Sequence, residues 1–474
     1  MAWGSVGNRQ LYYYIDHFND MKGIYLSFLV LIGLAHPLWA YQILTSSAQG
    51  QQVFSNMEQA LAAPQQVQAL DLSEQQLTEI PSEITSFKNL QRLDLYGNQI
   101  TYLPDDIAEL TDLQEINLSE NRYLHLEDTF QKLGKLPQLK KLYLGGNDFD
   151  SLPPAIQLLE SLEVLDLYWN NLSDIPKEIK QLKHLKELYL QDNQFYFFPV
   201  SLLEVDSLQV LDFFHNRLRS LPPQITALEE LQVLNLNQND LDSLPCQIGD
   251  LVQLREIYLN ANPKLHFDRV CKKLASIDGL KVLNFSDNRL ENIPLTINLL
   301  QNLEELYLQQ NALIELPHQL GGLGYLRVLY ISDNQLRHLP VSINHLHGLN
   351  DLDLSNNPQL NWAKVFQRLQ NNKSLLRLSV NTCKIQEFPD ELQLLTQLKE
   401  LNASENEMKR CNQAITQLTQ IQRIDLQSNY LSQMPRKISQ LKELRELYLV
   451  NNRFTLEQKE MIRAQLPQAV IHFE

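Results

Sequence analysis

The sequence predicts an α/β solenoid, with a parallel sheet on its concave face and short 3₁₀ or helical segments on its convex face. Three observations predict this fold class. A 23-residue pattern of leucines recurs along most of the 474-residue chain. An asparagine follows each short leucine alternation, and a leucine–proline pair follows the asparagine. Periods of this length are typical of solenoids, because one unit cannot bury its own leucines and neighbouring coils must cover them.

The unit over residues 185–207 shows how the pattern works locally. It reads LKELYLQDNQFYFFPVSLLEVDS, and Leu188 and Tyr189 are expected to point to opposite sides of a short strand. Asn193 carries amide donors and acceptors, so it can bond backbone groups where the chain leaves the strand. Pro199 has no N–H and cannot join a second long sheet. Stacked units therefore predict a buried ladder of asparagines inside an apolar core.

Seventeen such units fill residues 67–455. Successive units start 23 residues apart, except after the starts at 113, 254 and 349, where the step is 26. These three units lack the leucine–proline turn, and we expect longer outer helices in them. Asparagine occupies the ladder position in fifteen units, and the exceptions are Gln75 and Cys383. Cys383 is expected to be a small buried residue in the core.

The ends of the repeat array predict caps. Residues 49–66 carry apolar side chains at helical spacing, which predicts one amphipathic helix over the first coil. Residues 456–474 predict a C-terminal cap, in which a helix is broken at Pro467 and a last strand follows. A solenoid needs such caps because its terminal units otherwise expose apolar surface. The apolar residues of the predicted N-terminal helix are Val53, Phe54, Met57, Ala60 and Leu61.

The segment before the caps predicts export. Residues 21–48 contain Lys22 and an apolar run of about eleven residues, which suits a signal peptide and is short for a membrane span. Cleavage is expected after Ala40 or Ala48. Residues 1–20 contain Asp16 and Asp20, which fit poorly with the charged start of a signal peptide. These residues are therefore expected to be an upstream extension before a start at Met21. The alternatives are an uncleaved membrane anchor or a buried capping segment.

Composition narrows the class of partner and of chemistry. The formal net charge is −16, which argues against nucleic acid or an anionic membrane as the main partner. We find no phosphate-binding, zinc-protease, nucleophile-elbow or dinucleotide motif, and expect no catalysis, metal or cofactor. Cys246 and Cys271 lie on adjacent outer limbs where a disulfide is one alternative. His338, His345 and His347 are close in sequence, and solvated histidines are expected rather than a metal site.

The informative surface is the predicted concave face. Rigid aromatic side chains beside carboxylates are typical of binding hot spots, because they bury much area at low entropic cost. The alternative is that tyrosine simply suits any strand. The candidate partner-binding residues, all expected to be exposed there, are Tyr143, Tyr168, Trp169, Tyr189, Phe214, His215, Tyr258, Tyr307 and Tyr330.

These motifs resemble those of leucine-rich repeat proteins of the 23-residue Leu–Pro type. The resemblance covers residues 53–474. Over this range the chain is similar to bacterial exported members and to the Ras-group leucine-rich repeat proteins. It implies a curved horseshoe with parallel strands on its concave side. It also implies a non-catalytic role in binding another protein.

Several functions remain open at this point. The first is an exported module (secreted, periplasmic or on the cell surface) that binds a protein through its concave face. The second is carbohydrate or cell-wall binding, since aromatic and carboxylate side chains also suit sugars. The third is a cytoplasmic scaffold for signalling proteins such as a small GTPase, which requires the apolar run near the N-terminus to stay uncleaved. An enzyme is the least favoured class.

Overall fold

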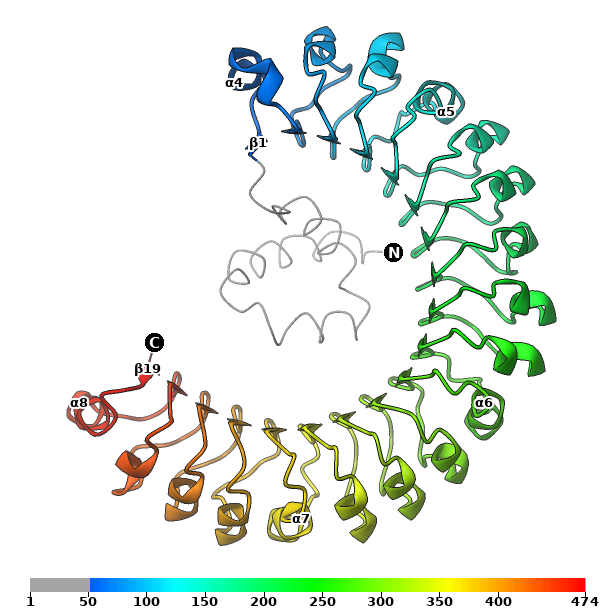
Figure 1. Ribbon diagram of the computed structural model, residues 1–474. Helices are drawn as coiled ribbons and strands as arrows, with labels where there is room; N and C mark the ends of the chain where they lie inside the picture. The colour runs from blue at the N-terminus through cyan, green and yellow to red at the C-terminus, as the bar shows by residue number, and fades with distance from the viewer. Residues whose placement is uncertain (1–51, 474) are drawn as a thin grey trace, which may run out of the picture. The chain divides into compact units, whose positions relative to one another are not determined.

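The computed structural model describes residues 52–473, so the predicted extension and signal segment within residues 1–48 lie outside the described residues. The chain divides into two compact units. The first comprises residues 52–148 and 158–167, and the second comprises residues 149–157 and 168–473. In each unit, the strands lie on one side of the coils and the outer turns on the other (Figure 1).

The strands are short, parallel and present once per repeat. The first unit contains β1 (Val53–Phe54), β2 (Ala69–Asp71), β3 (Arg92–Asp94), β4 (Glu115–Asn117), β5 (Lys141–Tyr143) and β6 (Val164–Asp166). The second contains β7 (Glu187–Tyr189), β8 (Val210–Asp212), β9 (Val233–Asn235), β10 (Glu256–Tyr258), β11 (Val282–Asn284), β12 (Glu305–Tyr307), β13 (Val328–Tyr330), β14 (Asp351–Asp353), β15 (Arg377–Ser379), β16 (Glu400–Asn402), β17 (Arg423–Asp425), β18 (Glu446–Tyr448) and β19 (Val470–His472).

Register fixes which side chains face the core. Within each unit, each strand pairs with the next in parallel, so that Leu211 stands opposite Leu188 and Leu234. These three leucines are fully buried, whereas most of the residues that flank them are partly exposed. The period of two along each strand therefore separates an aliphatic core from an outward sheet face. The predicted α/β solenoid is confirmed.

Most outer limbs are single 3₁₀ turns that follow a proline. In η7, the Pro199 carbonyl accepts the Leu202 N–H at 3.1 Å, which closes the turn and buries Leu202 against the core. The 3₁₀ turns are η2 (Pro64–Gln66), η3 (Ser82–Ser86), η4 (Asp105–Glu109), η5 (Pro154–Leu158), η6 (Lys177–Gln181), η7 (Val200–Glu204), η8 (Pro223–Ala227), η9 (Cys246–Asp250), η10 (Leu295–Leu299), η11 (His318–Gly322), η12 (Val341–His345), η13 (Asp390–Leu394), η14 (Gln413–Gln417) and η15 (Ile438–Gln440).

The three 26-residue units carry two-turn helices, as the sequence predicts. These are α5 (Leu126–Leu133), α6 (Phe267–Leu274) and α7 (Trp362–Leu369). Each helix holds a basic residue that reaches back to the carbonyl just before the proline of the preceding unit. In α5, Lys132 Nζ donates to the Leu103 oxygen at 2.6 Å. The same contact recurs from Lys273 to Leu244 and from Arg368 to Leu339.

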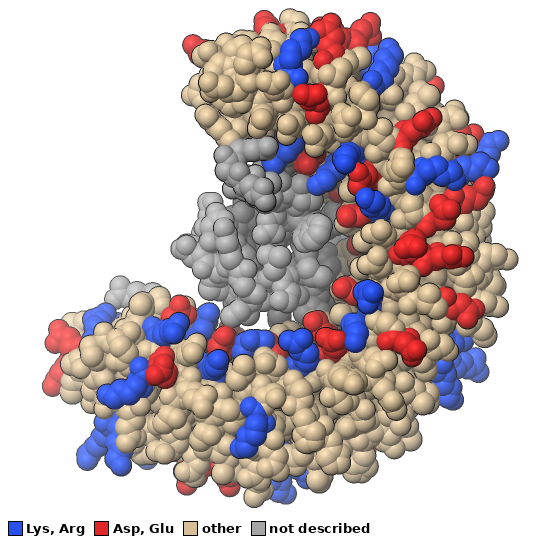
Figure 2. All heavy atoms as spheres, in the orientation of Figure 1, with Lys and Arg blue, Asp and Glu red and all other residues tan. Residues whose placement is uncertain are grey.

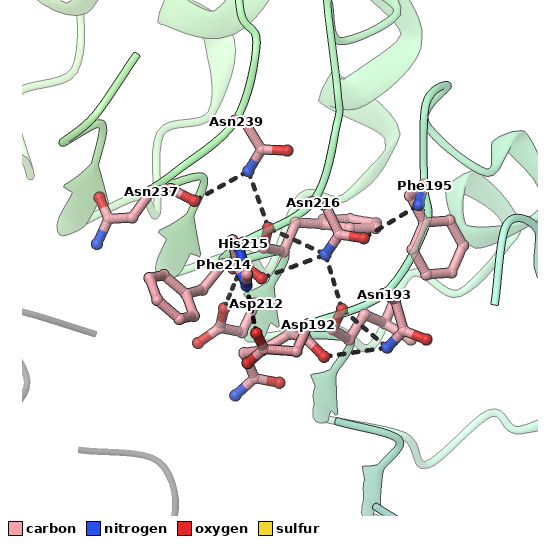
Figure 3. Close-up of polar contacts among 12 residues, drawn as sticks. Asp192, Asn193, Phe195, Asp212, Phe214, His215, Asn216, Asn237 and Asn239 are labelled. Carbon is pink, nitrogen blue, oxygen red and sulfur yellow. Dashed lines mark hydrogen bonds and ion pairs between the residues drawn. The ribbon is translucent and has the colours of Figure 1, made fainter. Parts of the chain in front are cut away.

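Most ladder asparagines are buried, and their amides bond backbone groups. Asn216 Nδ2 donates to the carbonyls of Leu190 at 2.8 Å, Phe213 at 3.2 Å and Phe214 at 3.3 Å. Its Oδ1 accepts the Phe195 N–H at 3.0 Å (Figure 3). One side chain thus satisfies backbone groups of two neighbouring units that would be costly to bury unpaired. The same set of contacts recurs at Asn239, Asn262, Asn334, Asn357, Asn406, Asn429 and Asn452.

The N-terminal cap differs from the prediction of one long helix. Helix α4 spans only Met57–Ala62, and Asn56 starts it by accepting the Glu58 N–H at 2.7 Å. Val53–Phe54 instead form β1, which pairs in parallel with β2. Helical spacing is therefore misleading here, because the open edge of β2 offers these residues hydrogen-bond partners that an isolated helix does not.

The C-terminal cap has a helix followed by a strand. Helix α8 spans Leu456–Gln465 and begins with a capping box between Thr455 and Gln458. Strand β19 then pairs with β18 and covers its edge. Its last described residue, Phe473, is buried.

Candidate functional site

The sheet face of the second unit presents two outward residues per strand. In β10 these are Glu256 and Tyr258, while Ile257 between them is fully buried. The Tyr258 hydroxyl donates to Glu256 Oε2 at 2.7 Å, so both side chains lie along the same face. Tyrosine two residues after glutamate thus forms a local pair, because alternate strand residues share a side of the sheet.

Other tyrosine–carboxylate pairs occur on later strands of the same face. Tyr307 donates to Glu305 in β12, and Tyr330 of β13 donates across to Asp351 Oδ2 of β14 at 3.2 Å. The rings of Tyr307 and Tyr330 meet edge to face, with centroids 5.5 Å apart. This edge-to-face contact is a favoured aromatic geometry.

Burial and the adjacent carboxylates raise the pKa of these phenols. Burial is the larger cause at Tyr258, Tyr307 and Tyr330, and a neighbouring negative charge adds to it in each case. The hydroxyls therefore stay protonated and donate to the carboxylates. The face therefore combines aromatic rings with carboxylates that the hydroxyls orient, and of these carboxylates Asp351 also pairs with Arg377.

Not every predicted contact residue is exposed. Tyr143, Phe214 and Tyr307 retain only 4%, 8% and 5% of their surface, so the expectation of exposure is wrong for these three. Tyr143 also belongs to the first unit, whereas the other candidates belong to the second. Of the rest, Tyr168, Tyr189, Tyr258 and Tyr330 are half-buried, and Trp169 and His215 are exposed.

Trp169 and His215 owe their exposure to a backbone feature of the repeat. Both precede a ladder asparagine and have left-handed φ values, of +49° and +51°. This conformation is uncommon for bulky residues, yet the position has positive φ throughout the described repeats. Asp192 shares it at +53°. The turn projects these side chains outward at the end of each strand, which makes them a rim to the sheet face.

On this rim, His215 and Asp192 form a pair. His215 Nδ1 lies within hydrogen-bond distance of Asp192 Oδ1, one repeat away (Figure 3). The hydrogen bond to Asp192 is the main reason that the His215 pKa is raised, and burial opposes it. On the adjoining strand, Asp212 accepts the Phe214 N–H at 2.7 Å and the Asn235 amide at 3.0 Å. Burial nevertheless raises the pKa of Asp212 to about 7.

The carboxylates Glu256, Glu305 and Asp351 are the part of the site that sequence reasoning missed. A signal for two of them was present, because Glu-Leu-Tyr or Glu-Ile-Tyr recurs with glutamate two residues before the tyrosine. The contact from Tyr330 to Asp351 has no such local signal, since it joins residues 21 positions apart. It depends on the pairing of β13 with β14.

The cysteines and the possible metal ligands are the other groups that the sequence singled out. All four cysteines are free, so the alternative of a disulfide between Cys246 and Cys271 is wrong. Burial raises the pKa of the Cys271, Cys383 and Cys411 thiols to about 12, which makes them poor nucleophiles. Within residues 52–473, no three histidine, cysteine or carboxylate side chains are grouped as a metal site would need.

Comparisons with known proteins decide the family. A model described as "Leucine-rich repeat region" matches residues 117–217, and one described as "Leucine rich repeat" matches residues 65–136, 206–263 and 302–358. A leucine-rich repeat protein of Leptospira interrogans is 31% identical, with 90% of this chain and all of that one covered and a TM-score of 0.55. The chain belongs to the leucine-rich repeat family. Leucine-rich repeat proteins are in general non-catalytic scaffolds for binding.

More distant leucine-rich repeat structures share the fold. The Toll–Spatzle complex of Drosophila aligns at 22% identity and a TM-score of 0.57, over 89% of this chain and 60% of that one. The TLR13–ssRNA13 complex aligns at 23% identity and a TM-score of 0.64, over 82% and 61%. A search of curated proteins finds no match. None of the helices within residues 52–473 is long and apolar enough to cross a membrane.

Proposed function

We propose that this leucine-rich repeat protein is an exported, non-catalytic module that binds another protein through the sheet face of its second unit. The observation that carries the proposal is the set of tyrosine–carboxylate pairs on β10, β12 and β13. Half-buried rings held by hydrogen bonds lose little conformational freedom on binding, which favours a contact surface. The exposed Trp169, in the rim position of its repeat, supplies a large aromatic anchor.

Charge limits the kind of partner. The chain carries a formal net charge of −16, and outward glutamates on this face lie beside tyrosine rings. Such a surface repels phosphate backbones and attracts lysine and arginine, whose cations also stack on aromatic faces. A protein with a basic patch therefore fits better than a nucleic acid. Neither a cofactor nor a metal is needed for this role.

The test is an affinity pull-down with the full chain, followed by titration of the purified partner. Trp169→Ala combined with Tyr189→Ala should weaken binding at least tenfold, because hot-spot aromatics commonly contribute 2 kcal/mol or more, about thirtyfold. Tyr325→Ala is the matched control, since Tyr325 is 65% exposed and lies outside the strands. Equal affinity for all three proteins, with unchanged thermal melting, would remove Trp169 and Tyr189 as contact residues.

Carbohydrate is the second candidate ligand, because tyrosine rings and carboxylates on one face also suit the stacking and hydrogen bonding of sugars. A glycan array with the same variants distinguishes the two. Specific glycan signals that disappear in the Trp169→Ala and Tyr189→Ala double variant would favour carbohydrate. A blank array together with a captured protein would favour protein binding.

Export has a separate test that does not depend on the ligand. Mass spectrometry of the mature N-terminus, combined with cell fractionation, should find a chain that begins after Ala40 or Ala48 outside the cytoplasm. A retained apolar run would instead indicate a membrane anchor or a cytoplasmic scaffold.

A further inference from the structure

A second surface lies on the outer side of the coils, away from the sheet face. It is an open trough of about 1060 Å³ that crosses the turns η10, η11 and η12. The start of α6 walls one end, and α7 walls the other. Figure 1 shows these three short turns between the two helices. The residues that matter most for its floor are Pro294, Leu295, Pro317, Pro340 and Val341.

Repeat length explains the trough. The 26-residue units raise two-turn helices on the outer side, whereas the 23-residue units between them have single 3₁₀ turns. Three short units in a row therefore leave a depression between two ridges.

The floor of the trough exposes apolar side chains. Leu295 is 60% exposed and Val341 is 62% exposed, and both begin their turns directly after a proline. His318 occupies the same position in the turn between them. Contiguous apolar side chains left in water between polar walls are typical of interaction sites.

The charge on the walls indicates what kind of ligand fits. On α5, Asp128 and Lys132 form an i,i+4 ion pair at 2.9 Å, and on α6 Asp268 and Lys272 do so at 2.6 Å. Lys132 and Lys272 are thus each paired within their own helix, whereas the exposed Arg269 of α6 has no carboxylate partner among the described residues.

Helix α7 departs from this pattern. Lys364 and Arg368 both line the trough, one helical turn apart, and the first turn of α7 has no acidic residue. Within residues 52–473, neither side chain forms an ion pair with a carboxylate. Like charges at this spacing disfavour a helix by roughly 0.2–0.5 kcal/mol. An anionic ligand group between them would remove that repulsion.

We propose that this trough, defined by Leu295, Val341, Lys364 and Arg368, binds a short apolar segment of a partner protein that carries a carboxylate. The apolar side chains of the segment cover Leu295 and Val341. Its aspartate, glutamate or C-terminal carboxylate lies against Lys364 and Arg368. The Arg368 guanidinium keeps donor N–H groups for this, because its contact with Leu339 uses one nitrogen.

The test is selection of random twelve-residue peptides displayed on phage against the full, immobilised chain, with each clone then measured as a synthetic peptide. Enriched peptides should combine two or more apolar residues with an acidic residue at one end. Val341→Asp should lower their affinity at least tenfold. Lys364→Glu should do the same, because it adds negative charge and offers Arg368 an internal partner like that of Lys132.

Val200→Asp is the matched control. Val200 begins η7 at the same turn position and is 67% exposed, but it is not part of the trough. All three variants change exposed side chains, so thermal melting should stay within a few degrees of the wild type. Binding that survives Val341→Asp and Lys364→Glu would overturn the proposal, as would peptides without acidic residues or no trough-dependent clones. The sheet-face variants should leave these peptides unaffected, so the two proposals fail independently.

Discussion

Two stretches of the sheet face in the second unit share the same repeat backbone but carry different outward side chains. The tyrosine face, meaning the outward residues of β7–β13, carries tyrosine, valine, asparagine and acidic side chains with no lysine or arginine. The charge ladder, meaning the first outward residue of β14–β18, alternates Asp351, Arg377, Glu400, Arg423 and Glu446. These five residues stand opposite one another in strand register.

The difference lies in how carboxylates are satisfied. On the charge ladder, Arg377 Nε lies 2.6 Å from Asp351, and Arg423 lies 3.7 Å from Glu446. Figure 2 shows basic and acidic side chains alternating along the inner edge over the later strands. On the tyrosine face, Glu187, Glu256 and Glu305 instead accept hydrogen bonds from neutral tyrosine hydroxyls. The charge ladder is therefore neutralised by ion pairs between its own residues, whereas the tyrosine face is left to attract a cation.

The largest expected effect tests the asparagine ladder, which both stretches share. Asn334 lies under the tyrosine face and Asn406 under the charge ladder, and each donates to three carbonyls. Changing either to alanine leaves several buried backbone groups unpaired, at about 3–5 kcal/mol in total. Thermal unfolding should show similar losses for both. A loss of stability in only one of the two variants would mean that the two stretches do not depend on the ladder in the same way.

Reversing a charge on the ladder should have the next largest effect. Arg377→Glu removes the bridge to Asp351 and places three acidic residues in a row with Glu400. The expected loss is about 1–3 kcal/mol, because like charges directly opposite on paired strands are unfavourable. Melting temperatures at low salt and at 1 M NaCl check this, since salt should recover much of the loss.

Arg377→Met separates the lost bridge from the new repulsion. It should cost less than Arg377→Glu and depend less on salt. Equal losses for the two variants would show that the alternation of charge has no energetic role.

The tyrosine face should instead show a pH dependence. The Asp212 pKa is raised to about 7 from 3.8, so the unfolded state binds fewer protons between these values. The free energy of unfolding therefore falls as pH rises from about 4 to about 7. Asp212→Asn should flatten that profile, match the wild type at pH 4 and exceed it at pH 8 by roughly 1–2 kcal/mol.

The repeat itself supports this substitution, because asparagine occupies the same strand position at Asn235 and Asn284. Asp206→Asn, at an exposed site, controls for the loss of one negative charge. Urea unfolding across pH 4–8 is the measurement. A profile that remains unchanged in Asp212→Asn would assign the pH dependence to other groups.

Repetition explains which features could be predicted from sequence. The period, the ladder asparagines and the three outer helices were predictable, because each is encoded within one unit and then repeated. The buried asparagine ladder at Asn216 has the same basis as that at Asn193. Features that depend on contacts between units were not predictable. The burial of Tyr307, the strand at Val53–Phe54 and the trough beside α7 all depend on what a neighbouring unit places there.

The smallest expected effect concerns the boundary between the two stretches. Asp351 accepts the Tyr330 hydroxyl at 3.2 Å and also pairs with Arg377, so it belongs to both. Removing either donor leaves the other in place. The double variant of Tyr330→Phe and Arg377→Met should therefore lose more stability than the two single variants added together, with a coupling of about 0.5 kcal/mol.

A double-mutant cycle on melting temperature measures that coupling, and Tyr258→Phe paired with Arg377→Met provides the control. Tyr258 donates to Glu256 within its own strand and has no contact with Asp351. The control pair should be additive. If the boundary pair were additive as well, Asp351 would belong to the charge ladder alone, and the tyrosine face would end at Tyr307 rather than Tyr330.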